Sequence, residues 1–389
     1  MTPLELWEKV LVSLQFLKTS HGQIPCTQCH GGNPNATGLK DAHQGLVRDP
    51  SYPDPDKACG QCHKEITKRI KTSLHYTLYP FERMVRIRAN KNPEIFSKVK
   101  AAFQTHCTNC HATCGSCHVS RPDYVEGGFV NGHLFKKQSD MVNQCTACHG
   151  SRVGNEFLAT LEKSEPDIHC EKKRMDCVSC HKADEIHGNG KIEHNNRYDV
   201  TQKHVRCENC HAKVLKDNIE AHVTHRQKLA CQICHSQGYI NCAICHVGRD
   251  TNGLPYFKNL KEWQGFKIAR NPDPTPNRPY LYILVRRAPA NLNIFDYYVK
   301  NGMDPVDFYN LPTWKYTSPH NIRRTTIYSQ SCNNCHGKEE LFLMESDMSS
   351  KEEIKANKSL IVPRAAIPQK IKGREVQKKG VSETPKVTW

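Results

Sequence analysis

This sequence has few of the side chains from which an ordinary globular core is built. Of its 389 residues only 37% are hydrophobic and 8% aromatic, and the mean hydropathy is −0.68. A chain of this length normally folds as two or three domains, each with its own apolar core. Burial of so few apolar side chains would hardly offset the entropy that the chain loses on folding. We therefore expect another chemical group to supply part of the apolar interior.

The chain also lacks a long hydrophobic run. Residues 1–20 carry charges at Glu5, Glu8 and Lys9, so they contain neither the apolar stretch of a secretory signal nor a membrane span. Their apolar residues recur at helical spacing instead. This spacing predicts a short amphipathic helix, and its apolar face would hold Leu4, Trp7, Val10, Leu11 and Leu14.

Cysteine and histidine, by contrast, are abundant, with 21 cysteines and 22 histidines. Twenty of the cysteines form ten copies of the pattern C-x-x-C-H, which is the attachment signature of c-type haem. The two thiols add to the vinyl groups of the porphyrin, and the adjacent histidine is the proximal ligand of the iron. Numbered one to ten in chain order, the motifs are Cys26-Cys29-His30, Cys59-Cys62-His63, Cys107-Cys110-His111, Cys114-Cys117-His118, Cys145-Cys148-His149, Cys177-Cys180-His181, Cys207-Cys210-His211, Cys231-Cys234-His235, Cys242-Cys245-His246 and Cys332-Cys335-His336.

Three other interpretations compete with haem attachment. A disulfide framework does not explain the histidine that follows every second cysteine. Structural zinc sites use C-x-x-C pairs, but they need no invariable C-H dipeptide because their ligands only have to close a tetrahedron. A thioredoxin-like redox motif occurs once in a domain rather than ten times. Haem attachment accounts for all ten copies, so the sequence predicts ten haem c groups.

The remaining histidines nearly match the number of axial positions left to fill. A bis-histidine iron needs a second imidazole, so ten are required beyond those of the motifs. Methionine is the other common distal ligand, but with enough histidines present none of the seven methionines is needed. The second ring nitrogen of each ligand is expected to donate to a carbonyl, a propionate or water. Ten of the following twelve histidines are expected as distal ligands: His21, His43, His75, His106, His133, His169, His187, His194, His204, His222, His225 and His320.

The formal net charge of +16 would ordinarily suggest nucleic acid or an anionic membrane as a partner. Ten haems carry twenty propionates, which change the formal charge to about −4 when every iron is ferrous and about +6 when every iron is ferric. The lysines and arginines are therefore interpreted as partners of the propionates, and no nucleic-acid partner is expected. Because haem c is attached outside the cytoplasm, we expect an exported chain in its processed form.

The spacing of the motifs indicates the fold class. One motif about every thirty residues leaves little room for long helices or large sheets. We expect a multihaem cytochrome c fold, with short helices and loops wrapped around a chain of stacked haems and a small β-containing excursion. Motifs three and four (107–118), and motifs eight and nine (231–246), are close enough in the chain to hold their haems in near contact.

Composition divides the chain into segments. Residues 247–331 contain no motif, are rich in aromatic residues, and include the β-like run 280–285 after the proline-rich, irregular connector 271–279. The expected organisation is an N-terminal amphipathic segment (1–25), a nine-haem region (26–246), a haem-free excursion (247–331), the tenth motif (332–337) and an extended polar tail (338–389) without a core of its own.

With its ten motifs, the region 21–337 resembles the multihaem c-type cytochromes of bacterial and archaeal respiration. That group includes periplasmic and outer-membrane conduits, filament-forming extracellular cytochromes and octahaem reductases. The segments 114–122, 145–154 and 313–324 are similar to the octahaem tetrathionate reductase-like branch. Reductases of this group usually carry lysine in place of the motif histidine at the catalytic haem, and no C-x-x-C-K occurs here.

The resemblance implies electron transfer, with other redox proteins as donor and acceptor, at an extracellular or cell-surface location or, as second choice, in the periplasm. The alternative is an oxidoreductase that acts on a small sulfur or nitrogen oxyanion at one open haem. No catalytic residue is assigned. Self-association is expected, in the boldest form as a head-to-tail filament in which His21 ligates a neighbour's iron. Cys170 is unpaired, and a buried thiol, an intermolecular disulfide and an unusual ligand all stay open for it.

Overall fold

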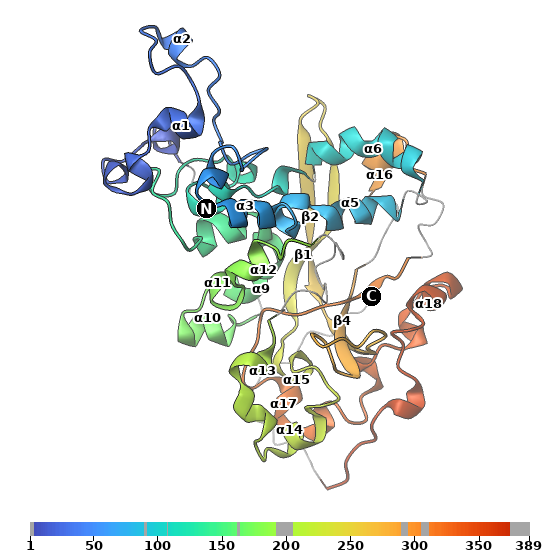
Figure 1. The fold of residues 1–389 in the computed structure, drawn as a ribbon. Coiled ribbons are helices and arrows are strands. Elements are labelled where there is room, and N and C mark those ends of the chain that lie inside the picture. Colours follow the sequence, from blue (N-terminus) through green and yellow to red (C-terminus); the bar gives the residue numbers. More distant parts are fainter. Residues whose placement is uncertain are drawn as a thin grey trace.

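The structure is a computed structural model, and it describes residues 4–88, 92–106, 108–161, 164–191, 205–288, 295–304 and 311–373, without the side chains of residues 109, 152, 241–246 and 257–264. Its elements are short and are joined by long loops (Figure 1). The α-helices of the first half are α1 (Cys26–His30), α2 (Leu39–Ala42), α3 (Lys64–Ile70), α4 (Leu74–Thr77), α5 (Tyr79–Arg86), α6 (Pro93–His106), α7 (Cys114–His118), α8 (Thr146–His149), α9 (Asn155–Leu158), α10 (Ile168–Lys173), α11 (Cys177–Cys180) and α12 (Ala183–Ile186).

The second half holds the strands and the remaining helices. The α-helices are α13 (Cys207–Cys210), α14 (Glu220–His225), α15 (Gln232–His235), α16 (Asp296–Lys300), α17 (Ile327–Gln330) and α18 (Lys351–Asn357). The strands are β1 (Tyr239–Arg249), β2 (Pro255–Gln264), β3 (Phe266–Arg270), β4 (Tyr282–Arg287) and β5 (Trp314–Tyr316). Single 3-10 or π turns are η1 (Glu8–Val10), η2 (Phe16–Lys18), η3 (His21–Gln23), η4 (Cys59–Gln61), η5 (Thr108–Cys110), η6 (Asp123–Val125), η7 (Met141–Cys145), η8 (Gly150–Gly154), η9 (Ala212–Leu215), η12 (Cys332–Asn334), η13 (Glu339–Leu341), η14 (Glu345–Asp347) and η15 (Arg364–Ala366).

Most of the C-x-x-C-H motifs begin a helical turn. Motif one is the helix α1, motif four is α7, motifs two and ten start with the 3-10 turns η4 and η12, and motif three contains η5. In a helical turn residues i, i+3 and i+4 lie on one face, so the two thiols and the histidine of a motif project to the same side. Motif nine differs, because its backbone belongs to the strand β1.

Two small antiparallel sheets form the β part of the molecule. β1 and β2 pair as a long hairpin, with Tyr239 opposite Gln264 and Arg249 opposite Pro255, and Figure 1 shows this hairpin running through the middle of the molecule. The second sheet has the order β3-β4-β5. The expected strand at 280–285 is confirmed by β4 with a shift of two residues, but β1 begins at residue 239, before the boundary expected at 246.

The main core lies against the three-stranded sheet. The apolar side chains of β3 and β4, including Ile268, Ile283 and Val285, are buried there. Leu343 and Val362, from the segment expected to be an extended tail, are fully buried in the same cluster. The expectation of an extended tail is therefore wrong for residues 338–373. This segment has too few apolar residues for a core of its own, but those few complete the core of the sheet, where each stabilises the fold by roughly 1.5–3 kcal/mol.

A second, smaller core holds the helices α5, α6 and α16 at the upper right of the molecule in Figure 1. It joins α5, α6 and α16 through Val85, Val99, Phe103 and Tyr298, all of them buried. α6 is the longest α-helix in the described part of the chain and ends at His106, directly before motif three. This core therefore fixes the position of the third motif.

The N-terminal segment does not form the expected amphipathic helix. Between residues 4 and 18 the chain makes only the 3-10 turns η1 and η2. Leu6, Trp7 and Leu14 are 82%, 62% and 79% exposed, so these side chains make too little tertiary contact to stabilise a continuous helix. Beyond this segment α1 and α2 extend from the body as an arm (Figure 1). No helix in the described part of the chain is long and apolar enough to cross a membrane.

Candidate cofactor-binding site

The histidines of the motifs lie opposite histidines from elsewhere in the chain. In the described part of the structure, eight motif rings each face one ring from outside the motifs, with centroids 5.9–6.3 Å apart. The pairs are His30 with His133, His63 with His21, His118 with His187, His149 with His75, His181 with His320, His211 with His169, His235 with His222 and His336 with His225.

This separation fits one metal ion held between two imidazoles. An imidazole ring with bonds of about 1.35 Å has its nitrogen about 1.15 Å from the centroid, and a metal–imidazole bond is about 2.0 Å long. Two rings that share one ion should therefore have centroids about 6.3 Å apart. The angles between the paired rings range from 21° for His21 and His63 to 82° for His75 and His149. Rotation about the metal–nitrogen bond leaves the centroid distance unchanged, so this spread of angles is compatible with shared coordination.

Hydrogen bonds hold many of these rings by their other nitrogen. Nδ1 of His30 contacts the carbonyl of Val47 at 2.8 Å, and Nδ1 of His118 contacts that of Lys136 at 2.6 Å. Three other rings have a carboxylate at Nδ1 instead. The contacts are His169 with Asp167 at 2.8 Å, His181 with Glu185 at 3.1 Å, and His222 with Asp217 at 2.7 Å. Ligating histidines are oriented in this way, because a donated Nδ1–H leaves Nε2 with its lone pair for the metal. The carboxylate partners had no signal in the sequence.

Burial favours the neutral imidazole, which is the form that binds a metal. The pKa of His75 is lowered to about 4, first by burial and then by the nearby ring of His149. Burial, followed by the charge of His181, likewise lowers the pKa of His320 to about 4. His181 differs, since its hydrogen bond with Glu185 raises its pKa.

Four of the twelve expected distal histidines are not among the eight pairs. Two of them face no motif histidine in the described residues, and the other two lie outside these residues. His194 and His204 fall outside the described residues. His106 is occupied otherwise, because its Nε2 contacts the carbonyl of Gly248 at 2.8 Å and its ring packs on Tyr297. His43 is exposed on the arm, with its Nδ1 2.7 Å from the carbonyl of Leu39 in its own helix. His21, expected to reach a neighbouring subunit, faces His63 of its own chain instead.

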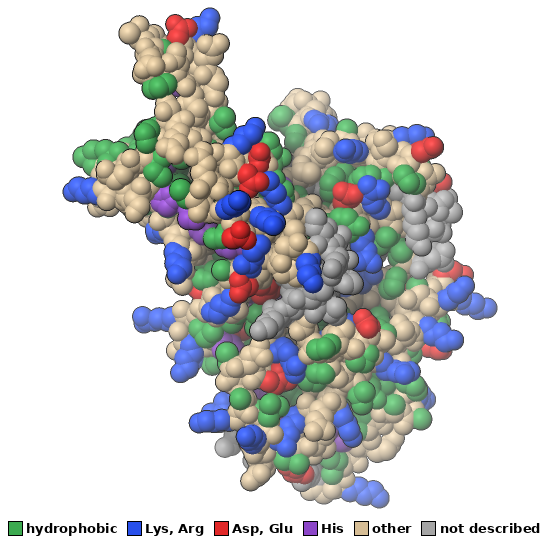
Figure 2. All heavy atoms as spheres, in the orientation of Figure 1, with side chains coloured by type: hydrophobic (Ala, Val, Ile, Leu, Met, Phe, Trp, Pro, Cys, Tyr) green, Lys and Arg blue, Asp and Glu red, His purple; other side chains and the backbone are tan. Residues whose placement is uncertain are grey.

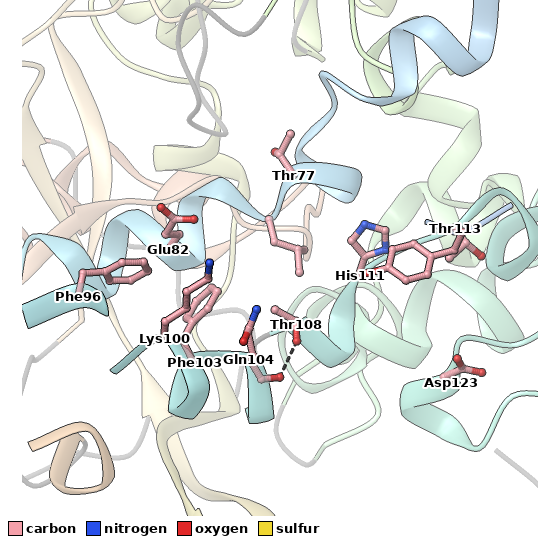
Figure 3. Close-up of a pocket in the computed structure, with 12 residues that line it drawn as sticks. Thr77, Glu82, Phe96, Lys100, Phe103, Gln104, Thr108, His111, Thr113 and Asp123 are labelled. Carbon is pink, nitrogen blue, oxygen red and sulfur yellow. Dashed lines mark hydrogen bonds between the residues drawn. The ribbon is translucent and has the colours of Figure 1, made fainter. Parts of the chain in front are cut away.

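Two motif histidines stand apart from the eight pairs. The side chain of His246 is not among those described. His111 is described, and its ring meets Tyr52 and Tyr76 edge-on, with centroids 4.7 and 5.0 Å away. It lines a cavity of about 390 Å³ beside α6 (Figure 3).

Contacts between the thiols show which motifs are neighbours in space. The thiols of Cys59 and Cys114 hydrogen-bond to each other, which raises the pKa of Cys59 and lowers that of Cys114. The same kind of contact joins motif three to five, five to six and seven to eight, through the thiol pairs Cys110 and Cys148, Cys145 and Cys177, and Cys207 and Cys231.

Weaker electrostatic interactions supply the remaining links. Cys29 interacts with Cys59, Cys117 with Cys145, Cys180 with Cys210, and Cys234 with Cys335. Together these neighbours give the order one, two, four, five, six, seven, eight, ten, with motif three beside motif five. The thiols of motif nine lie outside the described side chains.

All described cysteines are free thiols, including Cys170, which lies half-buried in α10. Burial raises the pKa of this thiol, and the negative charges of Asp167 and Cys177 raise it further. No group of three or more His, Cys, Asp or Glu side chains that could hold a bare metal ion occurs among the described residues. The described motif histidines meet other histidines in pairs rather than in groups of three or four.

Comparison of the chain with models of protein families, with curated proteins and with solved structures gave no match.

Proposed function

We propose that this chain is a decahaem c-type cytochrome, exported to the cell surface or the periplasm, that transfers electrons between other redox proteins. One observation carries the proposal. Eight histidines that follow a C-x-x-C pair each face a second histidine at the distance expected for a shared metal ion. Neither a disulfide framework nor a zinc site explains why these particular rings meet in twos.

Bound haem c would supply a reversible one-electron couple. The chain's own residues would hold and tune it. The thiols of each motif would hold the group covalently, and the two paired imidazoles would both bind its iron, which would keep other ligands away. The carbonyls and carboxylates at Nδ1 fix the orientation of the rings, and an anionic partner such as Asp217 also raises the basicity of its ligand.

The order of the motifs supports conduction along the molecule. Neighbouring thiols are in contact or interact electrostatically along the order one, two, four, five, six, seven, eight, ten. Since each thiol would carry the edge of one porphyrin, the residues would attach neighbouring groups edge to edge. Electron tunnelling falls exponentially with edge separation, so this order favours transfer over the length of the chain.

The surface charge agrees with a protein that binds many propionates. Figure 2 shows Lys and Arg side chains spread over the visible face rather than gathered in one patch, with histidines visible where the arm joins the body. A nucleic-acid surface would need a continuous basic stripe. The dispersed cations are suited to partners that lie all along the molecule.

The mass of the intact, denatured protein tests the proposal directly. Thioether bonds survive denaturation, so natively matured protein should carry ten covalent haems. Replacement of Cys332 and Cys335 by alanine should reduce the count to nine and serves as the control that one motif holds one group. A mass equal to that of the bare polypeptide would refute the proposal.

A further inference from the structure

The carboxylate of Asp167 contacts two distant parts of the chain, each of which carries a histidine that faces a motif. The residue is only 3% exposed. Its Oδ1 lies 2.8 Å from Nδ1 of His169, the ring that faces motif seven. Its Oδ2 accepts the amide of Ile322 at 2.8 Å, across 155 positions of the sequence. Ile322 comes two positions after His320, the ring that faces motif six. One side chain therefore contacts the partners of two motifs.

The loop that carries His320 is held closely around this contact. The amide of His320 donates to Oε2 of Glu156 at 2.8 Å, and this second carboxylate is also buried. The amide of Ile168, next to Asp167, donates to the carbonyl of Ile322 at 2.8 Å. Because these bonds leave the loop little freedom, a change at Asp167 should be transmitted to the ring of His320.

The charge of Asp167 also acts on motif six. Burial raises the pKa of the Cys180 thiol in this motif, and the charges of Cys210 and Asp167 raise it further. Burial and the charge of His181 lower the pKa of the His320 ring, whereas the charge of Asp167 opposes that change. Asp167 therefore lies close to the groups of motif six as well as to the histidine that faces motif seven.

We propose that Asp167 is a positioning residue shared by motifs six and seven, which orients one axial histidine for each and places a single negative charge beside both. This inference rests on the proposed function and goes beyond it by naming a residue that couples two neighbouring haems. An anionic partner makes a ligating imidazole more basic and so favours the ferric iron. The thiols Cys180 and Cys210 of these motifs are neighbours. The shared charge thus lowers the potentials of two successive haems together.

Asp167→Asn in the fully haem-loaded protein tests the proposal. Asparagine keeps the N-cap of α10, since its Oδ1 can still accept the amide of His169. It removes the charge, and its other polar atom is an amide donor that cannot accept the amide of Ile322. In a spectroelectrochemical titration two haems, about a fifth of the absorbance, should become easier to reduce, with a ferrous-to-ferric ratio about three- to tenfold larger at a fixed potential. The low-spin ferric EPR signals of two haems should also move, because they depend on the angle between the imidazole planes.

Asp217→Asn is the matched control. Asp217 also contacts a distal histidine, with its Oδ2 2.7 Å from Nδ1 of His222, but its Oδ1 accepts the amide of Ile219 from its own segment at 3.3 Å. This variant should therefore change one haem, about a tenth of the absorbance. A change of one haem in both variants would refute the sharing.

The remaining outcomes decide as well. Unchanged potentials in Asp167→Asn would reduce Asp167 to a helix cap, and changes in more than two haems would indicate a general loosening of the fold, so either result overturns the proposal. If this variant matures with fewer than ten haems, peptide mass mapping decides. Loss confined to motifs six and seven supports the sharing, and any other pattern refutes it. Failure of the proposed function has a different signature, which is a wild-type chain without covalent haem.

Discussion

Replacing His222 by alanine tests whether the facing histidines are axial ligands. The His222 ring lies 6.2 Å from that of His235, and its Nδ1 is 2.7 Å from Asp217. The backbone carbonyl of residue 222 accepts the amide of Arg226 at 2.9 Å, a contact that alanine retains. Alanine also has the highest helix propensity, so α14 should persist. The substitution thus removes one imidazole and little else.

The expected result is one additional open haem. His222→Ala should bind one more carbon monoxide per chain than the wild type, which changes about a tenth of the Soret absorbance. Free imidazole should restore the low-spin spectrum, because the space of the lost ring can receive it. His43→Ala is the matched control, since His43 is exposed and faces no motif histidine among the described residues. If His222→Ala stays as low-spin as the control, the facing rings are not ligands and the reasoning fails.

Two further predictions concern the fold and the assembly. Leu343→Ala, at a fully buried position of the main core, should lower the free energy of unfolding by about 2–5 kcal/mol in denaturant titrations. Leu254→Ala, at a position 61% exposed, should change it by less than about 0.5 kcal/mol, and similar losses in the two variants would contradict the packing of the tail. The exposed apolar side chains of residues 6–14 should drive self-association. Negative-stain images should then show extended or closed assemblies that Trp7→Asp with Leu14→Asp disperses, and wild-type monomers at native concentration would refute this.

The sequence predicted the motifs and the stock of histidines because both depend on spacing and number alone. It also located the strand β4, since Ile283, Leu284 and Val285 form an apolar run, two of them β-branched, that a sheet can bury. The predicted amphipathic helix was wrong at residues 4–18, because the apolar residues have helical spacing but no surface to pack against. The sequence also failed at Leu343 and Val362, because a few apolar residues in a polar tail do not indicate which distant strand they will cover.

The histidine census could not have identified the partner of each motif. Pairs such as His181 with His320 and His336 with His225 join residues more than a hundred positions apart, and only the folded chain brings them together. Carboxylates that hold the rings, such as Asp167 and Asp217, resemble any other acidic residue in the sequence. The number of histidines outside the motifs also does not show that Nε2 of His106 contacts the carbonyl of Gly248.

The neighbours of motif three in space could not be predicted from the spacing of the motifs either. Only Ala112 and Thr113 separate motifs three and four, which suggested a single closely coupled pair. Among the described thiols, motif four lies beside motifs two and five, and motif three lies beside motif five, so the order of the motifs in the chain is not their order in space. Under the proposed function, the paired histidines along the series from one to ten would keep other ligands away from the irons through which electrons pass. The ring of His111 differs, because it faces Tyr52 and Tyr76 and no described histidine.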